Sequence, residues 1–313
     1  MFTKNKEVIA GRDATVVSGL GKMSLRDTLE CGQAFRYENL GVRDGIAEYL
    51  VTVGDSLIFV GQRAAGELIF FDTDDAAFSV AEKYFSLHTD FEAIREDILS
   101  RTDSAWLEKA AESAAGVTIL SQDPWEMLVS FIISQNNNIP RIRKIIRTVC
   151  AEYGKNLAID KLAKCPCGVV DSAPCDEKCK NCGICYTFPT ARDILERPEG
   201  LLPSHPGFRY KYILDAANQV DTGKVSLADI KSQDSYDYTV TELKKILGVG
   251  DKVASCVALF GFGNLEAFPI DVWIRRAIDL YFDGSLEPTT LGKYAGVAQQ
   301  YIFHYLRNIE SEK

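Results

Sequence analysis

The chain has 313 residues, of which 46% are hydrophobic and 25% are charged, and its formal net charge is −9. This composition is typical of a globular protein with a sizeable core, and it excludes an intrinsically disordered chain. The acidic balance argues against a protein that coats nucleic acid through bulk charge. A DNA-binding function would therefore have to rest on local patches and specific motifs.

The N-terminal sequence MFTKNKEVIAGRD has no apolar stretch of signal-peptide length, and no apolar run in the chain is long enough to span a membrane. We therefore expect a soluble, intracellular protein of the cytoplasm and nucleoid, or of a nucleus, with no membrane partner. A reducing compartment disfavours disulfides, so metal ligation or buried thiols explain the nine cysteines better.

The N-terminal third of the chain is predicted to be rich in β-strands. Residues 47–53, 56–61 and 67–71 are short runs of β-branched and aromatic residues, and Gly-Asp and Ala-Ala-Gly steps separate them. This pattern indicates an antiparallel meander. Short helices are expected to follow over residues 76–85 and 91–99.

Beyond this part the apolar residues recur with helical period. Asp123-Pro124 is a helix start signal, because proline is favoured at the first helical position, and residues 125–135 follow as an apolar helix. The polar triplet Asn136-Asn137-Asn138 stops that helix, and a second one is predicted over residues 139–153. The periodicity alone therefore predicts a β-rich part followed by an α-rich part.

Residues 242–261 read ELKKILGVGDKVASCVALFG, in which an amphipathic helix runs into Gly248-Val249-Gly250 and a second helix begins at once. The two glycines allow a tight turn with exposed backbone, and the N–H groups at the start of the second helix suit a phosphate oxygen. We interpret this segment as a helix-hairpin-helix unit that grips the DNA backbone without reading its sequence. A purely structural turn is the alternative for a Gly-x-Gly taken alone.

Lys252 lies in the first turn of that second helix, where the helix dipole disfavours a charged amine. A neutral amine is the form that attacks covalently, so Lys252 is a candidate nucleophile. Cys256 lies four residues later and shares a helix face with it. Asp271 precedes a helix predicted over residues 272–281, so it can cap that helix and also face a developing positive charge.

A cysteine-rich insert over residues 164–186 holds six of the nine cysteines. Cysteines separated by two residues are typical of structural metal sites, and we expect a zinc site of one or two ions. A [4Fe–4S] cluster is one alternative, because three of the cysteines share the spacing of a bacterial ferredoxin, and unliganded thiols are another. The candidate ligands are Cys165, Cys167, Cys175, Cys179, Cys182 and Cys185.

Five stretches, in order along the chain, resemble the motifs of the 8-oxoguanine DNA glycosylases, a branch of the helix-hairpin-helix GPD superfamily of base-excision enzymes. They are Gly32 to Tyr37 (GQAFRY), Asp123 to Ile142, Gly248 to Cys256, Pro269 to Val272, and Tyr294 to Phe303. The resemblance implies an α+β fold. An N-terminal antiparallel β-sheet domain of residues 1–118 would pack on an all-helical glycosylase domain of residues 119–313.

The same resemblance implies a bifunctional DNA glycosylase and lyase of base-excision repair that removes 8-oxoguanine opposite cytosine. Lys252 would attack C1′, expel the base and form a Schiff base, and β-elimination would then cleave the strand. Asp271 would stabilise the oxocarbenium-like transition state by its charge. No cofactor would be required for this chemistry. The partner would be double-stranded DNA with an oxidised purine, and we expect a monomer.

The damaged base has to leave the stack before an enzyme can act on it. By the family pattern, Phe303 and Cys256 would sandwich the base, and Gln299 would bind its Watson–Crick edge. The backbone carbonyl of Gly32 would accept the N7 hydrogen that only the oxidised base carries. Pro269 completes the expected base pocket.

The remaining implied residues contact the DNA around the gap that the base leaves. Asn136 would fill that gap, Arg141 and Arg209 would bind the orphaned cytosine, and Phe208 would wedge beside it. The hairpin glycines that would bind the backbone are Gly248 and Gly250.

The predicted helix over residues 139–153 is basic, with Arg141, Arg143, Lys144 and Arg147 and no acid among them. Phosphate binding is therefore the alternative role for Arg141. We expect this helix to offset the acidic net charge by facing the DNA.

Two other functions compete with the oxidised-guanine prediction. A glycosylase for alkylated bases would keep the aspartate but generally lacks the lysine, so Lys252 argues against it. A non-catalytic, metal-stapled DNA-binding damage sensor would need none of Lys252, Asp271, Cys256 and Phe303, and their joint presence argues against that alternative.

Overall fold

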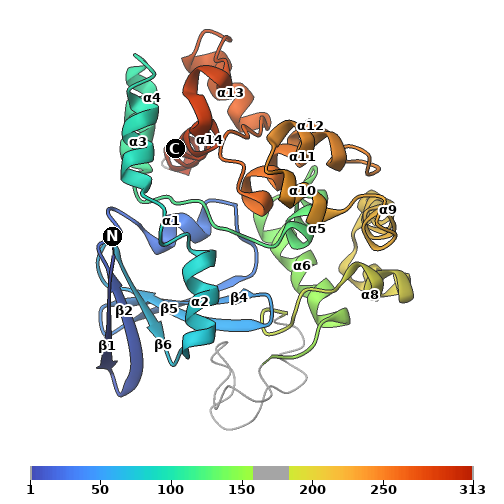
Figure 1. The fold of residues 1–313 in the computed structure, drawn as a ribbon, viewed down its shortest axis with the longest axis horizontal. Coiled ribbons are helices and arrows are strands. Elements are labelled where there is room, and N and C mark those ends of the chain that lie inside the picture. The colour runs from blue at the N-terminus through green and yellow to red at the C-terminus, as the bar shows by residue number, and fades with distance from the viewer. Residues whose placement is uncertain (1, 158–182, 312–313) are drawn as a thin grey trace.

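The computed structural model describes residues 2–157 and 183–311, with six strands and one short helix in the N-terminal part and the other helices after them (Figure 1). Tight turns shape the strand pairs, since Ala10-Gly11 and Asp44-Gly45 both have positive φ at each residue. That turn conformation matches the twist of antiparallel strands. The strands are β1 Thr3–Ile9, β2 Arg12–Ser18, β3 Tyr37–Arg43, β4 Ile46–Val53, β5 Ser56–Gln62 and β6 Glu67–Phe71.

The strands form one antiparallel sheet in the order β1-β2-β6-β5-β4-β3. The three predicted runs correspond to β4, β5 and β6, and β3 to β6 form the predicted meander. The β1–β2 pair extends the sheet beyond β6, which the sequence analysis did not predict. β1 and β3 lie at the sheet edges and expose most of their side chains, so they lack the apolar alternation that marks a half-buried strand.

Two helices cover one face of the sheet. α1 Leu25–Glu30 and α2 Asp75–Tyr84 bury Leu25, Leu29 and Phe78 against the strands. The strand residues in this sheet core include Val51, Ile58, Val60, Leu68 and Phe70.

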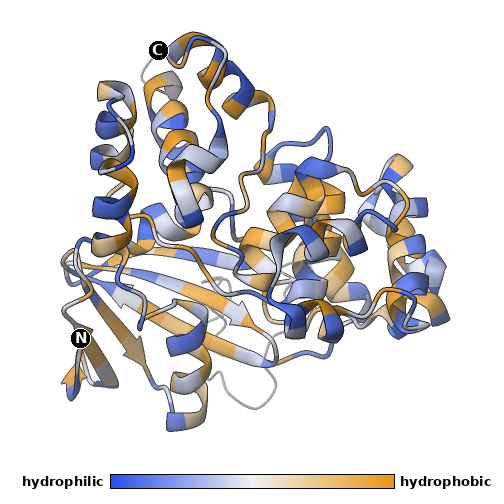
Figure 2. Ribbon diagram, turned by 45° about the horizontal axis from the view of Figure 1, so that its top comes forward, coloured by the Kyte–Doolittle hydropathy of each residue, from blue (hydrophilic) through white to orange (hydrophobic). Residues whose placement is uncertain are grey.

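α5 Pro124–Ser134 is the central helix of the second core, and every residue from Met127 to Ile133 is buried. It begins at the predicted start signal, and the Asp123 side chain caps it by accepting from the Glu126 amide at 2.8 Å. α5 contacts α6 Ile139–Tyr153, α9 Tyr210–Asp221 and α12 Asp251–Val257. Elsewhere hydrophobic residues alternate with hydrophilic ones along strands and around helices, which separates buried faces from exposed ones (Figure 2).

α3 Phe91–Leu99 and α4 Ala105–Ser113 lie beside the C-terminal helix α14 Ala295–Ser311 (Figure 1) and contribute to the helical core. They precede residue 118, where the sequence analysis places a domain boundary, and that boundary stays a prediction. The other helices are α8 Ala191–Glu196, α10 Leu227–Gln233, α11 Tyr236–Leu243 and α13 Val272–Tyr281, with short 3₁₀ or π turns at Pro198–Ser204, Gly207–Arg209, Ala258–Phe262 and Pro288–Tyr294. Over residues 2–157 and 183–311, none of the helices combines the length and apolarity needed to cross a membrane.

The described segments on either side of residues 158–182 lie next to each other in the fold. An antiparallel bridge joins Asn156 to Tyr186, and the Leu157 amide donates to the Cys185 carbonyl at 2.7 Å. The far end also docks on the sheet, because the Thr52 hydroxyl donates to the Ile184 carbonyl. The chain therefore leaves α6 and returns within one pair of extended segments.

Candidate active site

The predicted hairpin joins α11 to α12 through Gly248-Val249-Gly250. Gly248 has φ +80° and lies so close to Tyr212 that a Cβ would come within 2.5 Å of the ring. Gly250 is exposed, and no heavy atom of the described residues would lie within 4 Å of a Cβ there. No side chain in the described part of the chain caps α12, which leaves the first amides of this helix, beside the exposed Gly250, available to a phosphate as the phosphate-binding interpretation requires.

Lys252 lies in the first turn of α12 and is half-buried. Its Nζ lies 3.3 Å from the Ser134 Oγ and 5.2 Å from the centre of the Phe131 ring. Because the Ser134 hydroxyl donates to the Phe131 carbonyl at 2.8 Å, the hydroxyl oxygen is left to accept from the lysine. These contacts orient the amine, and among residues 2–157 and 183–311 it forms no ion pair that would hold it back from a substrate.

Cys256 lies one helical turn below Lys252 and is buried. Burial raises the pKa of its thiol, and the nearby Lys252 ammonium offsets part of that rise while the Asp271 carboxylate adds to it. Cys256 therefore stays a neutral thiol, a polarisable apolar surface rather than a nucleophile. The electrostatic influence of both charged residues on one thiol places Lys252 and Asp271 at a common site.

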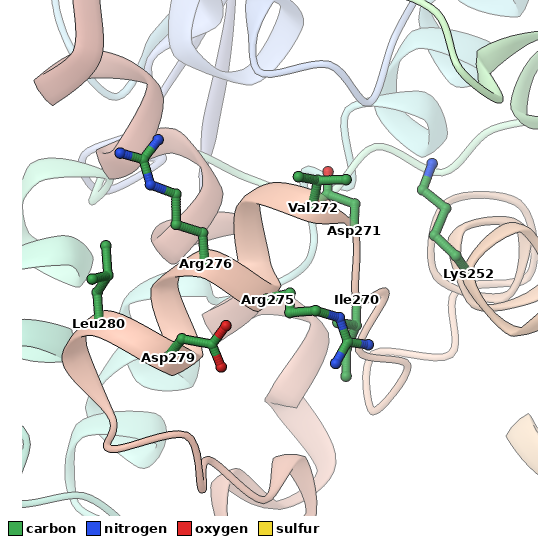
Figure 3. A pocket seen from close by; sticks show the side chains of 8 residues that line it. All are labelled: Lys252, Ile270, Asp271, Val272, Arg275, Arg276, Asp279 and Leu280. Atoms are coloured by element: carbon green, nitrogen blue, oxygen red, sulfur yellow. The ribbon is translucent and has the colours of Figure 1, made fainter.

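Asp271 caps α13, and its Oδ1 accepts from the Ile274 amide at 2.9 Å. Lys252 and Asp271 line one surface pocket of about 740 Å³, and Figure 3 shows both side chains pointing toward the same side of it. The pocket continues along α13 past Arg275 to Asp279. The helix cap thus fixes a carboxylate in the pocket that the Lys252 amine also lines.

Gly32 follows α1 with φ +88°, a conformation that glycine adopts without strain. A Cβ at this position would lie 3.2 Å from the Ile139 Cδ1 and 3.5 Å from the Phe303 ring. The structure therefore brings Gly32 and Phe303 together, although 271 residues separate them in the chain. Phe303 also lies beside Arg307, whose guanidinium carbon is 5.8 Å from the ring centre.

Gln299 and Phe303 lie one turn apart on α14. Gln299 is buried, and its Oε1 accepts from the Gln300 Nε2 at 2.7 Å. The expected pocket residue Pro269 is buried two residues before Asp271. These placements agree with the roles expected in base recognition, and the roles themselves stay predictions.

Asn136, Phe208 and Arg209 form a second group, on the loops after α5 and before α9. Asn136 is exposed with φ +48°, and Arg209 donates to its carbonyl at 3.0 Å and to the Gln135 carbonyl at 2.9 Å. Phe208 keeps 46% of its surface exposed, with the Arg209 guanidinium 4.5 Å from its ring centre. Burial, and then the nearby Arg141 charge, lower the pKa of Arg209. Arg209 thus tethers the loops that carry the expected gap-filling and wedge residues.

The prediction that the basic helix faces the DNA is wrong for two of its arginines. Arg143 and Arg147 lie one turn apart on the face of α6 that packs on the sheet, and both form ion pairs with Glu38 of β3. Both also donate to the Tyr37 carbonyl. The acid that pairs with them comes from the sheet, about a hundred positions earlier in the chain, and of the four basic residues named for this helix only Arg141 and Lys144 remain exposed.

Five of the six candidate metal ligands, Cys165, Cys167, Cys175, Cys179 and Cys182, lie outside the described residues. Cys185 is described and is buried with Leu50 and Ile184 in a small apolar cluster. In the part of the chain that the structure covers, no group of three or more His, Cys, Asp or Glu side chains is placed to hold a metal ion. The metal site stays a prediction.

Two contributions to this site received no role in the sequence analysis. Ser134 orients the catalytic candidate Lys252, and only its position in the motif around α5 could have indicated this. The other is a buried ion pair between Arg36 and Glu126, at 2.7 Å, which ties the segment after Gly32 to α5. The arginine lies within GQAFRY and the glutamate within DPWE, and the sequence alone does not indicate that these two motifs are in contact.

Comparison with known proteins connects this geometry to one group of enzymes. Residues 16–128 match the family described as 8-oxoguanine DNA glycosylase, N-terminal domain. An N-glycosylase/DNA lyase of Saccharomyces cerevisiae is 27% identical over 277 residues, which is 82% of this chain and 67% of that protein.

Two solved structures are similar over almost the whole length. MBOgg1 in complex with a low-affinity DNA ligand is 31% identical with a TM-score of 0.80, over 98% of this chain and 99% of that one. The 8-oxoguanine glycosylase/lyase of Clostridium acetobutylicum, in complex with double-stranded DNA containing cytosine opposite 8-oxoG, is 29% identical with a TM-score of 0.78. That match covers 99% of this chain and 98% of the other.

Proposed function

The chain belongs to the 8-oxoguanine DNA glycosylase family, and on this premise we propose that it excises 8-oxoguanine opposite cytosine through a Lys252 Schiff base. It is a base-excision repair enzyme with N-glycosylase and DNA lyase activities. The observation that supports the mechanism most strongly is that Lys252 and Asp271 line one pocket, with the buried Cys256 thiol near enough for both charges to act on it. An amine and a carboxylate in one pocket are the two groups that the proposed attack at C1′ requires.

In the proposed reaction the Lys252 Nζ bonds to C1′ of the damaged nucleotide while the glycosidic bond breaks. The base leaves with the bonding electrons, and positive charge develops on the sugar. The Asp271 carboxylate, held by its cap on α13, stabilises that charge. Loss of the amine protons and opening of the sugar ring give the Schiff base. Removal of a C2′ proton, for which the departed base can serve, then expels the 3′ phosphate.

Base recognition is proposed to use the contact between Gly32 and Phe303. With its ring against the Gly32 backbone, Phe303 would stack on the flipped base while the Gly32 carbonyl accepts the N7 hydrogen. Cys256 would cover the opposite face, Gln299 would bind the Watson–Crick edge and Pro269 would close the pocket. Undamaged guanine carries a lone pair at N7, so the carbonyl would repel it.

The duplex is proposed to lie across the hairpin and the second loop group. Gly250, and Gly248 behind it, would let the backbone of α12 approach a phosphate. The exposed Asn136 and Phe208 would enter the duplex beside the extruded base. Arg141 and Arg209 would bind the orphaned cytosine, and for Arg209 this requires it to exchange at least one carbonyl contact for the base.

Borohydride trapping tests the mechanism. Parent protein, Lys252→Gln and Lys245→Gln would each be incubated with an 8-oxoguanine:cytosine duplex and borohydride. Lys245 is the matched control, because it lies on the same hairpin, pairs with Glu242 and does not line the pocket. We expect a covalent complex with the parent and Lys245→Gln, and none with Lys252→Gln.

Other outcomes would change the proposal in different ways. Trapping by Lys252→Gln at the parent level would assign the nucleophile to another amine. Base release without trapping by the parent would leave a glycosylase and remove the Schiff base. Absence of both from the parent would refute 8-oxoguanine as the substrate.

The chemistry proposed above requires neither a metal ion nor a cofactor. We propose in addition that the insert binds a structural metal ion, and elemental analysis of the purified protein with and without Cys-to-Ser changes at Cys179 and Cys182 tests this. Metal retained by the doubly substituted protein would place the ion elsewhere. We also propose that the enzyme is a monomer and that it acts in the cell compartment that contains the DNA. Light scattering with and without a duplex tests the monomeric state.

A further inference from the structure

The segment between α1 and β3 is held by Gln33, whose side chain is fully buried. Its Nε2 donates to the Thr28 carbonyl at 3.0 Å and to the Thr118 carbonyl at 2.7 Å. Its Oε1 accepts from the Leu120 amide at 2.9 Å, and its own carbonyl accepts from the Gln122 Nε2 at 2.9 Å. One residue therefore ties the end of α1 to the segment that enters α5.

Gly32 directly precedes Gln33, which we call a hub because its hydrogen bonds join separate segments of the chain. The carbonyl of Gly32 lies in the same rigid peptide plane as the Gln33 nitrogen, so the orientation of Gln33 controls the direction of that carbonyl. Gly32 has φ +88° and no side chain to hold it. On its other side Cys31 ends α1, and the Cys31 thiol donates to the Thr28 carbonyl at 3.3 Å.

We propose that Gln33 is a positioning residue for damage recognition, one that fixes the Gly32 carbonyl on the N7 position of the flipped base. This role rests on the proposed function, and it makes Gln33 the residue on which the selection of 8-oxoguanine over guanine depends. A hydrogen bond weakens steeply when donor and acceptor lose alignment. If the Gly32–Gln33 peptide could change orientation, the preference for 8-oxoguanine, which carries a hydrogen at N7, over guanine, which carries a lone pair there, would therefore weaken. The chemistry at C1′ would be unaffected.

The test compares binding in a Lys252→Gln background, where the DNA stays unprocessed. Dissociation constants are measured for duplexes that carry 8-oxoguanine, guanine or a tetrahydrofuran abasic analogue opposite cytosine. Gln33→Met keeps the length of the side chain and removes its amide bonds. We expect the preference for 8-oxoguanine over guanine to fall about tenfold, the effect of one hydrogen bond, while abasic binding changes less than about twofold.

Gln62→Met is the matched control. The Gln62 Oε1 accepts from the Leu25 amide at 2.8 Å, and its Nε2 donates to the Met23 carbonyl at 2.9 Å and the Glu67 carbonyl at 3.1 Å. It is thus a similar hub at the opposite end of α1. We expect Gln62→Met to lower the melting temperature as Gln33→Met does and to keep the preference for 8-oxoguanine.

Gln122→Met provides a milder second variant, because Gln122 is half-buried and contacts only the carbonyl side of Gln33. We expect it to lower the preference about threefold, and it replaces Gln33→Met if that protein does not fold. An unchanged preference in both variants, or an equal loss in Gln62→Met, would overturn the positioning role. A Lys252→Gln protein without any preference for 8-oxoguanine would instead overturn the proposed function and this inference with it.

Discussion

Residues 32–36, here called the reading segment because Gly32 is expected to recognise the base, are held in a different way from Lys252, which is expected to react with the sugar. Gln33 and Arg36 are buried and tied to backbone carbonyls of distant segments. Lys252 stands at the wall of an open pocket with one hydroxyl oxygen 3.3 Å from its amine. Discrimination needs a fixed acceptor, whereas covalent attack needs a group that can move onto the substrate. Substitutions in the two regions are therefore expected to change different properties of the protein.

The largest effect is expected from the ion pair behind the reading segment. Arg36 is 2% and Glu126 13% exposed, so Arg36→Met strands a buried carboxylate and should cost about 3–5 kcal/mol of unfolding free energy. Urea denaturation measures this. Arg36→Met combined with Glu126→Leu should recover part of the loss, since neither charge then remains. A single variant as stable as the parent would show that the segment does not depend on the pair.

At the pocket that contains Lys252, Asp271→Asn keeps the helix cap and removes the negative charge. Asparagine caps helices as well as aspartate does, so the melting temperature should stay near that of the parent. The single-turnover rate of base release should fall about 10²–10³-fold, because the developing positive charge loses its partner. Asp271→Ala, which removes cap and charge together, should lower both quantities. A full excision rate in Asp271→Asn would exclude the electrostatic role.

Gly32→Ala perturbs the reading segment directly. An added Cβ would be strained at φ +88° and would crowd the Ile139 Cδ1 at 3.2 Å, so we expect a loss of about 1–2 kcal/mol of stability. Excision of 8-oxoguanine should fall more than cleavage of a preformed abasic site, since only the first reaction reads a base. Equal losses in the two assays would separate Gly32 from recognition.

Phe208→Ala should affect the exposed loop group without affecting the fold. With 46% of the side chain already exposed, the change in stability should stay within about 0.5 kcal/mol. Duplex affinity should drop about tenfold, the effect of losing one aromatic–base contact. Val42→Ala, at an exposed position on the sheet edge, is the control and should leave affinity unchanged.

The smallest effect is a pH dependence next to the reading segment. Burial lowers the pKa of His304, which is bonded to Asn308 on α14, so the folded protein favours the neutral ring. The stabilisation is present above the unfolded pKa of about 6.5 and is lost as the pH falls from there toward the lower pKa of the folded protein. His304→Gln should show a correspondingly shallower loss in urea titrations between pH 7.5 and 5.5.

The sequence predicts well those features that local chemistry determines. Asp123-Pro124 was expected to start a helix and Asp271 to cap one, and each aspartate accepts from the amide three positions later, because capping requires only residues three positions apart. The helices over residues 139–153 and 272–281 have the predicted bounds. The order of β-rich and α-rich parts follows from periodicity in the same way, whereas the packing of one on the other came from the resemblance.

Features that depend on distant partners were beyond the sequence. Arg143 and Arg147 form part of a basic run, yet both pair with Glu38 across about one third of the chain. The hub at Gln33 and the Arg36–Glu126 pair have the same origin, since their partners lie 85 to 90 positions away. Polar residues in a short motif do not reveal whether they touch substrate, solvent or a carbonyl from another element.

The bridge between Asn156 and Tyr186 has a consequence for how this chain can change. Because the main chain leaves at Leu157 and returns beside it at Cys185, the length of chain between these two residues does not set the distance between α6 and α8. Ile184 belongs to the fixed side of the junction, since the Thr52 hydroxyl donates to its carbonyl. Such a junction lets a lineage, or an engineer, change the number of residues between positions 157 and 183 without moving either helix.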